Sequence, residues 1–301
     1  MQKNTAYFFG ILIGGGKFSD TQDARVNIEF PYKDWMSGEV RISPQWFEDS
    51  VTKIIPLINK VLNTSAVPRY IQASTPRYCI EINSVPELLY EMLRNYGIRS
   101  VGELRRHASI EKLVKDMDDE CKRSFISGFA DVVGSCRASH RNYTLQATII
   151  SFEIFGENWK LPYELCQTFY DLGIPVDQIL WNHPNMHAGA SSTAHWKKGH
   201  KVRIRAGDFS KVGYGLECKK KGLEKLLELE LKSRGFISEG KLCPNRNYKI
   251  IRKKVHHEDE NSKDLPPEVR GHFIHYTDIC RALGCPHAPT KWLDDQIGKY
   301  T

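Results

Sequence analysis

Two short segments of the chain match each other in kind, and this internal duplication constrains the fold more than any other feature. The first segment, residues 8–16, reads FFGILIGGG, and the second, residues 126–134, reads ISGFADVVG. Both are apolar, long enough for a short helix, and end on a glycine that can terminate a helix. We therefore expect two similar half-domains, each opening on such a helix.

Small residues inside the two segments predict how the helices meet. Gly10 and Gly14 would lie one helical turn apart on the same face, and Gly128 occupies the third position of the second segment, as Gly10 does in the first. Small residues on one face let two helices pack backbone to backbone, which predicts a seam between the halves. A flexible turn at 14–16 and a phosphate-binding loop are the alternatives, and the lack of a following Lys-Ser/Thr pair disfavours the second.

The residues after each segment repeat the same order of patterns. In the first half, alternation of polar and apolar residues and helical periodicity predict a hairpin over 25–30 and 39–43, a helix from 46 to 55, strands at 69–73 and 77–83, and helices at 86–96 and 101–114. In the second half they predict a strand at 143–155, a helix at 161–172, strands at 178–182 and 201–205, and a helix at 223–231. The order indicates an α+β fold in which helices cover one face of each antiparallel sheet.

This order, with a nine-residue motif opening each half, resembles the LAGLIDADG homing endonucleases in their single-chain form. The resemblance covers roughly residues 1 to 235 and implies halves at 1–117 and 118–235, followed by a C-terminal appendage at 236–301. It implies a monomeric, pseudo-twofold domain of two αββαββα halves. Their saddle-shaped antiparallel sheets would lie in the major groove of double-stranded DNA.

The polar faces of these strands would then read the duplex, since Arg and Lys donate to guanine or phosphate and Asn and Gln pair with adenine. In the first half the expected DNA-binding residues are Arg25, Asn27, Glu29, Arg41 and Arg77. In the second half they are Arg137, His140, Arg141, Gln146, Thr148, Lys201, Arg203 and Arg205. For the last three, the alternative is an ordinary outward-facing polar row of an amphipathic strand.

The motif positions that carry cleavage in the family depart from its pattern here. The resemblance implies an acidic residue at the penultimate position of each motif, where the pair holds divalent metal ions such as Mg²⁺. The matching residues are Gly15 and Val133, which cannot ligate a metal through their side chains. Asp131, two positions earlier, would brace the partner helix. We expect sequence-specific DNA binding without this cleavage; the alternative is an active homing or restriction endonuclease with relocated ligands, for example Asp20 and Asp23.

Charge agrees with a polyanionic partner but does not require one. The formal net charge is +7, with a pI of about 8.9, and nine Lys or Arg between residues 197 and 221 face only Asp208 and Glu217. A solvated basic loop or a protein-interaction domain that kept only the fold are the alternatives. With the polar strands, this basic region favours double-stranded DNA as the partner, together with a nuclease or regulatory subunit that would supply missing chemistry.

The C-terminal appendage has a different composition, with many Cys and His residues. A structural zinc is one interpretation, with the ligands Cys243, Cys280, Cys285 and His287, although no Cys-x2-Cys pair is present. Unliganded residues and a histidine-metal nuclease around His256, His257 and Asp259 are the alternatives. A second histidine group, His183, His187, His195 and His200, is expected in a loop that drapes over a phosphate backbone.

The remaining composition is that of an ordinary cytoplasmic protein. No apolar run approaches the roughly 20 residues that span a bilayer, and the apolar stretch at 7–13 lacks a charged leader and a cleavage site, so we expect no membrane partner. The eight cysteines are scattered along a chain large enough not to need disulfides, which predicts free thiols in a reducing compartment.

Overall fold

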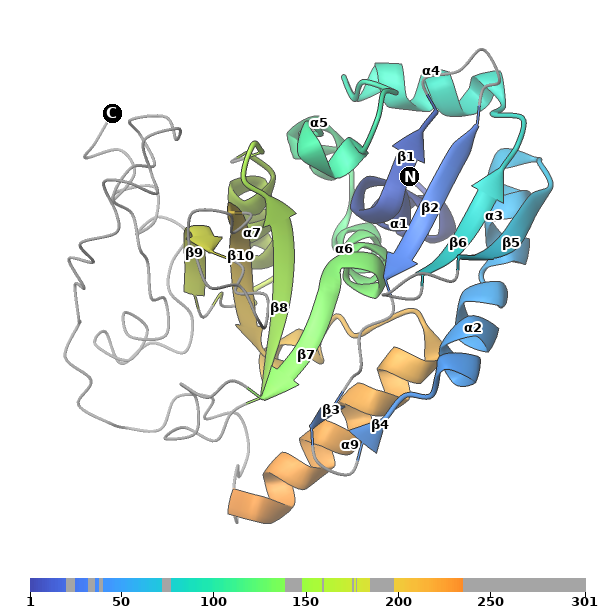
Figure 1. Ribbon diagram of the computed structural model, residues 1–301. Helices are drawn as coiled ribbons and strands as arrows, with labels where there is room; N and C mark the ends of the chain where they lie inside the picture. Colours follow the sequence, from blue (N-terminus) through green and yellow to red (C-terminus); the bar gives the residue numbers. More distant parts are fainter. Residues whose placement is uncertain are drawn as a thin grey trace, which may run out of the picture.

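The structure, a computed structural model, describes residues 1–19, 25–31, 36–37, 40–71, 77–138, 148–158, 160–174, 176, 178–184 and 198–234 (Figure 1). Within these ranges, the longest and most apolar helices still fall short of what a membrane span requires. The predicted zinc ligands and the histidines near residue 256 lie outside this part of the chain.

The first half begins with the motif helix and builds one four-stranded sheet. Its elements are α1 (Lys3–Gly15), β1 (Gly16–Phe18), β2 (Val26–Pro31), β3 (Met36–Ser37), β4 (Val40–Arg41), α2 (Pro44–Thr52), α3 (Ile55–Leu62), β5 (Ala66–Ile71), β6 (Arg77–Ile82) and α4 (Glu87–Asn95). A segment containing the 3-10 helix η1 (Leu104–Arg106) and the short helix α5 (Glu111–Lys115) leads to the second half. Strands β1, β2, β6 and β5 form an antiparallel sheet in that order, and β3 and β4 form a separate two-stranded sheet.

The second half repeats this plan. Its elements are α6 (Asp119–Val133), β7 (Gly134–Ala138), β8 (Thr148–Phe155), α7 (Lys160–Asp171), β9 (Gln178–Pro184), β10 (Lys198–Arg205), α8 (Ala206–Phe209) and α9 (Glu217–Arg234). The antiparallel order β7-β8-β10-β9 matches the first sheet strand for strand. The predicted α+β class and the duplicated element order are confirmed.

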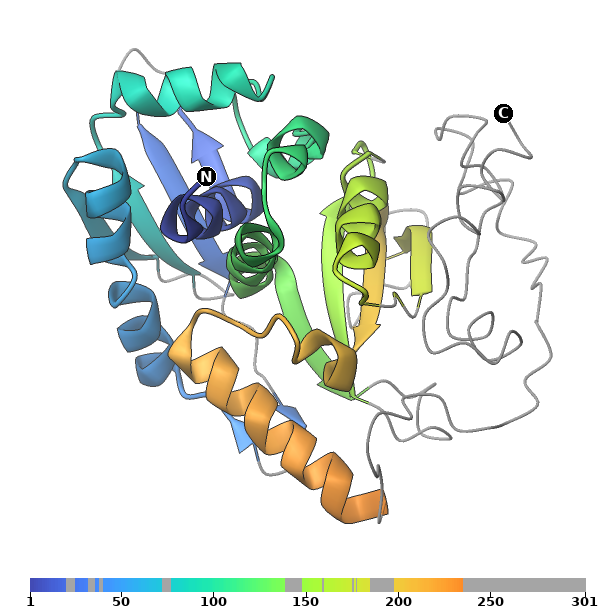
Figure 2. The same cartoon turned by 180° about the vertical axis from the view of Figure 1, so that it is seen from behind.

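Helices cover the same side of both sheets. Helices α1 and α6 pack on β2, and α7 packs on β10, and these helices lie in front of the strands when the molecule is seen from behind (Figure 2). Alternation along the strands explains this: Val26, Ile28 and Phe30 of β2 are fully buried. The opposite faces of the two sheets are turned toward the viewer in Figure 1.

The two motif helices meet through glycine, as predicted. A Cβ atom on Gly10 of α1 would lie 2.7 Å from the backbone nitrogen of Phe129 and closer still to the carbonyl oxygen of Phe125. A Cβ atom on Gly128 of α6 would meet the carbonyl oxygen of Tyr7 in the same way. Gly14 and Gly15 continue the helix and Gly16 begins β1, so the alternatives of a flexible turn and a phosphate loop are wrong.

The predicted hairpin of the first half is wrong. Strand β2 pairs with β1 and β6, whereas residues 40–41 pair with 36–37 in a separate two-stranded sheet. The true partner, β1, has only three residues, which is too short for an alternating pattern to be visible in the sequence.

One predicted helix is interrupted. The helix expected over 101–114 is divided into η1 and α5, with Gly102 at a φ of 49°. A left-handed residue interrupts a right-handed helix, and glycine adopts this conformation without steric cost. The strand expected over 143–155 is present as β8 from Thr148, and residues 143–147 of that prediction lie outside the described part of the chain.

Candidate nucleic-acid interface

The uncovered face of the first sheet carries polar side chains from three strands. Asn27 and Glu29 alternate with the buried residues of β2, and their register partners on β6 are Glu81 and Cys79. Two ion pairs cross this face. Arg77 Nη1 lies 3.1 Å from Glu29 Oε2, and Arg69 Nη1 lies 3.7 Å from Glu81 Oε2. The pairs hold two arginines, each more than half exposed, over the sheet.

The uncovered face of the second sheet is more basic. Lys201, Arg203 and Arg205 are half-buried and alternate along β10 with Val202 and Ile204, which are fully buried. Their register partners on β8 are, in the same order, Glu153, Ser151 and Ile149. A single carboxylate, that of Glu153, therefore faces the three cations across β8, and its Oε1 lies 3.6 Å from Lys201 Nζ.

The structure brings together part of the predicted DNA-binding set. Asn27, Glu29 and Arg77 share the first face, with Arg25 exposed just before β2, and the β10 row forms the second. Arg41 does not join the first sheet as expected, because it belongs to the small β3-β4 sheet. Arg137 and Thr148 lie in the paired strands β7 and β8. His140, Arg141 and Gln146, with Asp20 and Asp23, fall outside the described residues.

Gly15 and Val133, the last residues of α1 and α6, carry no carboxylate and are closely packed. A Cβ atom on Gly15 would lie 2.5 Å from the carbonyl oxygen of Glu29 and 2.8 Å from Cγ1 of Val132. Val133 is only 4% exposed. Across the part of the chain that the structure describes, no three His, Cys, Asp or Glu side chains are grouped so that they could hold a metal ion.

Asp131 lies in the core rather than on the polar faces. Its Oδ2 accepts a hydrogen bond from the hydroxyl of Tyr7 on α1 at 2.7 Å and from the backbone N–H groups of Gly215 and Leu216, each at 2.9 Å. Burial raises the pKa of Asp131 to about 6, against the opposing effects of Lys219 and these hydrogen bonds. Asp131 thus ties α6 to the partner helix, the contact that the resemblance implies, and also to the segment before α9.

A buried lysine closes the end of the second motif helix. The ammonium of Lys219, on α9, donates to the carbonyl oxygens of Ala130, Asp131 and Gly134 at 3.3, 2.6 and 3.1 Å. A cation is favoured there because the last carbonyls of a helix carry partial negative charge. The sequence pattern gave no signal for this residue, which appears in a basic run that reads as solvated.

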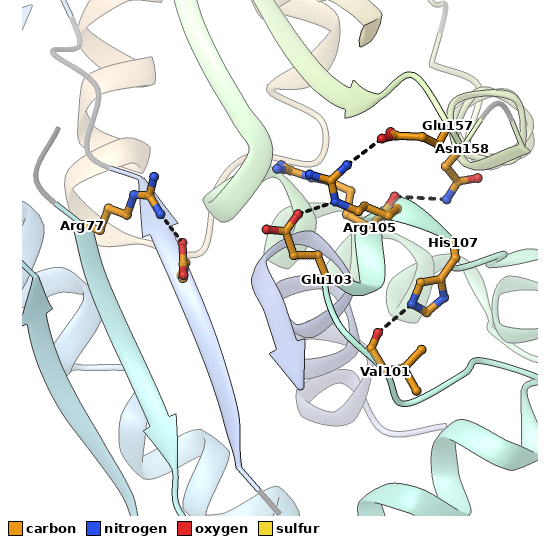
Figure 3. A network of polar contacts seen from close by, with 9 residues as sticks. Arg77, Val101, Glu103, Arg105, His107, Glu157 and Asn158 are labelled. Atoms are coloured by element: carbon orange, nitrogen blue, oxygen red, sulfur yellow. Dashed lines mark hydrogen bonds and ion pairs between the residues drawn. The ribbon is translucent and has the colours of Figure 1, made fainter. Parts of the chain in front are cut away.

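The segment between the halves adds basic residues that the sequence patterns did not single out. A β-bridge between Lys17 and Glu103 joins it to the first sheet, and Arg106 donates to Glu157 of the second half. Asn158 of the second half donates to the carbonyl oxygen of Arg105 (Figure 3). The apolar pattern of this segment predicted one continuous helix over 101–114, whereas the structure divides it into η1 and α5, so periodicity could not place Arg105 and Arg106 beside the two faces.

His200 lies in β10 and not in a loop, so its predicted place over a phosphate backbone is wrong. It is fully buried, one of its ring nitrogens lies 3.0 Å from the carbonyl oxygen of Gly156, and burial lowers its pKa to about 4. Cys79, Cys121, Cys166 and Cys218 are buried free thiols, as expected for these four positions.

Comparisons with known proteins gave matches to solved structures. No family model matches the chain, and no curated protein matches it significantly. A structure of I-DmoI in complex with DNA and calcium is 16% identical, with a TM-score of 0.40, and the match covers 69% of this chain and 86% of that one. The I-SmaMI LAGLIDADG homing endonuclease bound to cleaved DNA is 9% identical, with a TM-score of 0.40, over 78% of this chain and 90% of that one.

Proposed function

We propose that the chain binds double-stranded DNA sequence-specifically through the uncovered faces of its two sheets, without metal-dependent cleavage at the motif helices. The observation that carries the proposal is the row of Lys201, Arg203 and Arg205 along β10. The row lies on the side of the sheet away from α7, next to a first face that also carries cations.

The spacing of this row suits a duplex. A strand rises about 3.4 Å per residue, close to the 3.4 Å per base pair of one DNA strand, so alternate side chains of β10 are spaced by about two base-pair steps. The major groove also admits a β-ribbon. A two-stranded portion of either sheet can therefore follow the groove while its side chains reach successive base edges.

The residue types suit base reading as well as phosphate contact. Arginine can pair bidentately with guanine, and asparagine with adenine, so Arg203 and Asn27 are our proposed base contacts. The ion pairs of Glu29 with Arg77 and of Glu153 with Lys201 restrict the cationic side chains before DNA arrives. Less side-chain entropy is then lost on binding.

Metal-dependent cleavage would depend on the side chains at positions 15 and 133, at the ends of the motif helices. Hard divalent ions need carboxylate oxygens, and Gly15 and Val133 supply none. The backbone of β2 lies where a side chain at residue 15 would begin. We infer a binding module, for which a nuclease or regulatory subunit is the matching partner.

A selection from a randomised duplex pool tests both parts of the proposal. The full chain is incubated with the pool in Mg²⁺ or in EDTA, at two salt concentrations, and both bound sequences and nicked products are recovered. We expect a defined motif, weaker binding at higher salt, and intact DNA in Mg²⁺. Absence of salt-dependent binding would refute the DNA proposal, and Mg²⁺-dependent nicking would refute the loss of cleavage.

A pair of variants locates the interface. Arg203→Gln should weaken binding to the selected duplex by about 1–3 kcal/mol and relax the preference at one position. Lys60→Gln is the matched control, because Lys60 is exposed on α3, a helix that packs on α1 and β5. Equal affinities for the two variants would show that β10 is not the reading strand.

A further inference from the structure

The segment that joins the two halves is fastened to both of them, at the place where the two polar faces meet. On the first side, Phe18 N–H donates to the carbonyl oxygen of Gly102 at 2.9 Å. On the second side, the amide of Asn158 donates to the carbonyl oxygens of Arg105 and Ala108 at 3.1 and 2.9 Å. These bonds fix the backbone of η1 between the sheets (Figure 3).

Two neighbouring arginines of η1 use their donors differently. Both guanidinium groups lie over the ring of Phe155, with Cζ 4.5 Å from the ring centre for Arg105 and 3.9 Å for Arg106. Arg106 donates from Nε to Glu103 at 2.8 Å and from Nη1 to Glu157 at 2.7 Å. The Nε of Arg105 has no hydrogen-bond partner among the residues that the structure describes, although it is buried.

Arg105 is placed on the uncovered side of the sheets. Phe155, on which it stacks, alternates in β8 with Ile154, which is 2% exposed and faces the core, so the Phe155 ring shares the polar face with Glu153. Stacking occupies the flat side of a guanidinium and leaves its N–H edge for hydrogen bonds in the plane.

Carboxylates of both sheets and of the joining segment act electrostatically on the Arg105 guanidinium. Burial lowers the pKa of Arg105 to about 10, against the opposing effects of Glu103 and Glu153, while the neighbouring Arg106 lowers it further and Glu29 of the first sheet raises it weakly. The group therefore keeps its charge at neutral pH.

We propose that Arg105 binds a backbone phosphodiester at the centre of the bound duplex, where the two polar faces meet. This inference rests on the proposed DNA-binding function. The planar fork of arginine fits two phosphate oxygens, and the stacked side chain is already restrained, so little rotamer freedom remains to be lost. Arg106, whose Nε and Nη1 donate to Glu103 and Glu157, holds the segment in place instead.

The test is the salt dependence of binding to a fluorescently labelled, mixed-sequence DNA duplex, because a phosphate contact does not depend on sequence. Wild type, Arg105→Gln, Arg105→Lys and the control Lys60→Gln are titrated between about 50 and 200 mM salt, and thermal unfolding checks their folding. Loss of one phosphate contact lowers the slope of log Kd against log salt by about 0.9. The weakening caused by Arg105→Gln should therefore be about 3.5-fold greater at the lower salt concentration than at the higher one.

Each outcome bears on a different claim. A reduced slope for Arg105→Gln, with slopes near wild type for Arg105→Lys and Lys60→Gln, supports the phosphate contact, since lysine keeps the charge. A wild-type slope for Arg105→Gln overturns it, even if affinity falls equally at every salt concentration, because that result indicates a role in positioning η1 only. If the wild type itself shows no salt-dependent binding, the proposed function fails and the assignment of Arg105 fails with it.

Discussion

Two glycines one turn apart on α1 allow a sharp test of the seam between the motif helices. Replacing either with alanine should add about 1 kcal/mol of helix propensity. Their surroundings differ. A Cβ atom on Gly14 would lie 3.1 Å from Cβ of Val132 and Cγ2 of Val133, which are side-chain atoms, whereas a Cβ atom on Gly10 would meet backbone atoms of Phe125 and Phe129. Side chains can shift by a few tenths of an ångström, but backbone atoms yield only if the helices separate.

We expect Gly14→Ala to change the free energy of unfolding by no more than about 1 kcal/mol, and Gly10→Ala to lower it by about 3 kcal/mol, since overpacking of this kind costs more than the propensity gain. Urea unfolding followed by circular dichroism measures both. With a urea dependence of about 1–3 kcal/mol per molar, a difference of at least about 2 kcal/mol separates the two midpoints by roughly 0.7 M or more. Equal midpoints would mean that close backbone approach is not the reason for Gly10, and Gly128→Ala, on the facing helix, should repeat the Gly10 result.

Two further predictions concern the ends of the motif helices. Because burial raises the pKa of Asp131 from 3.8 to about 6, the native state binds this proton more tightly than the unfolded state does; its ionisation therefore costs roughly 3 kcal/mol of stability as pH rises from about 4 to above 6. Asp131→Asn removes this ionisation. Urea unfolding should therefore show the free energy of unfolding of the variant rising, relative to that of wild type, by roughly 3 kcal/mol between about pH 4 and above pH 6. Parallel stability profiles for the two proteins would contradict the raised pKa of Asp131. The double variant Gly15→Asp, Val133→Asp should have a lower melting temperature and show no Mg²⁺-dependent nicking. The reason is that the Cβ atom of the new side chain at position 15 would lie 2.5 Å from the carbonyl oxygen of Glu29. Nicking at an unchanged melting temperature would show that only the two acidic residues were missing.

The parts of the fold that sequence reasoning predicted are those with a repeated local pattern. The motif segments contain glycines at matching positions, and the structure pairs Gly10 with the backbone of α6 and Gly128 with that of α1. The alternation of Val202 and Ile204 with three cations placed β10 and its polar row correctly. In each case, residues of one type at a fixed spacing determine which face of the helix or strand is packed.

The errors have the opposite cause. Strand β1 is too short to show a period, so β2 received the wrong partner, and the left-handed Gly102 divides a segment whose apolar residues read as one helix. Lys219 and Arg105 were missed because their positions depend on contacts with α6 and with Phe155, which lie far away in the sequence. Long-range packing of this kind leaves no local signal.

The matching strand order of the two sheets has a consequence for the shape of the target. Strands β6 and β10 occupy equivalent positions in their sheets, yet β6 presents Arg77, Cys79 and Glu81 where β10 presents Lys201, Arg203 and Arg205. A symmetric dimer reads two copies of one half-site and so requires a palindrome. On the proposed function, a single chain whose two polar faces differ in this way is suited to a site with unlike left and right arms. The arm under β10 should carry the larger share of the salt-sensitive affinity.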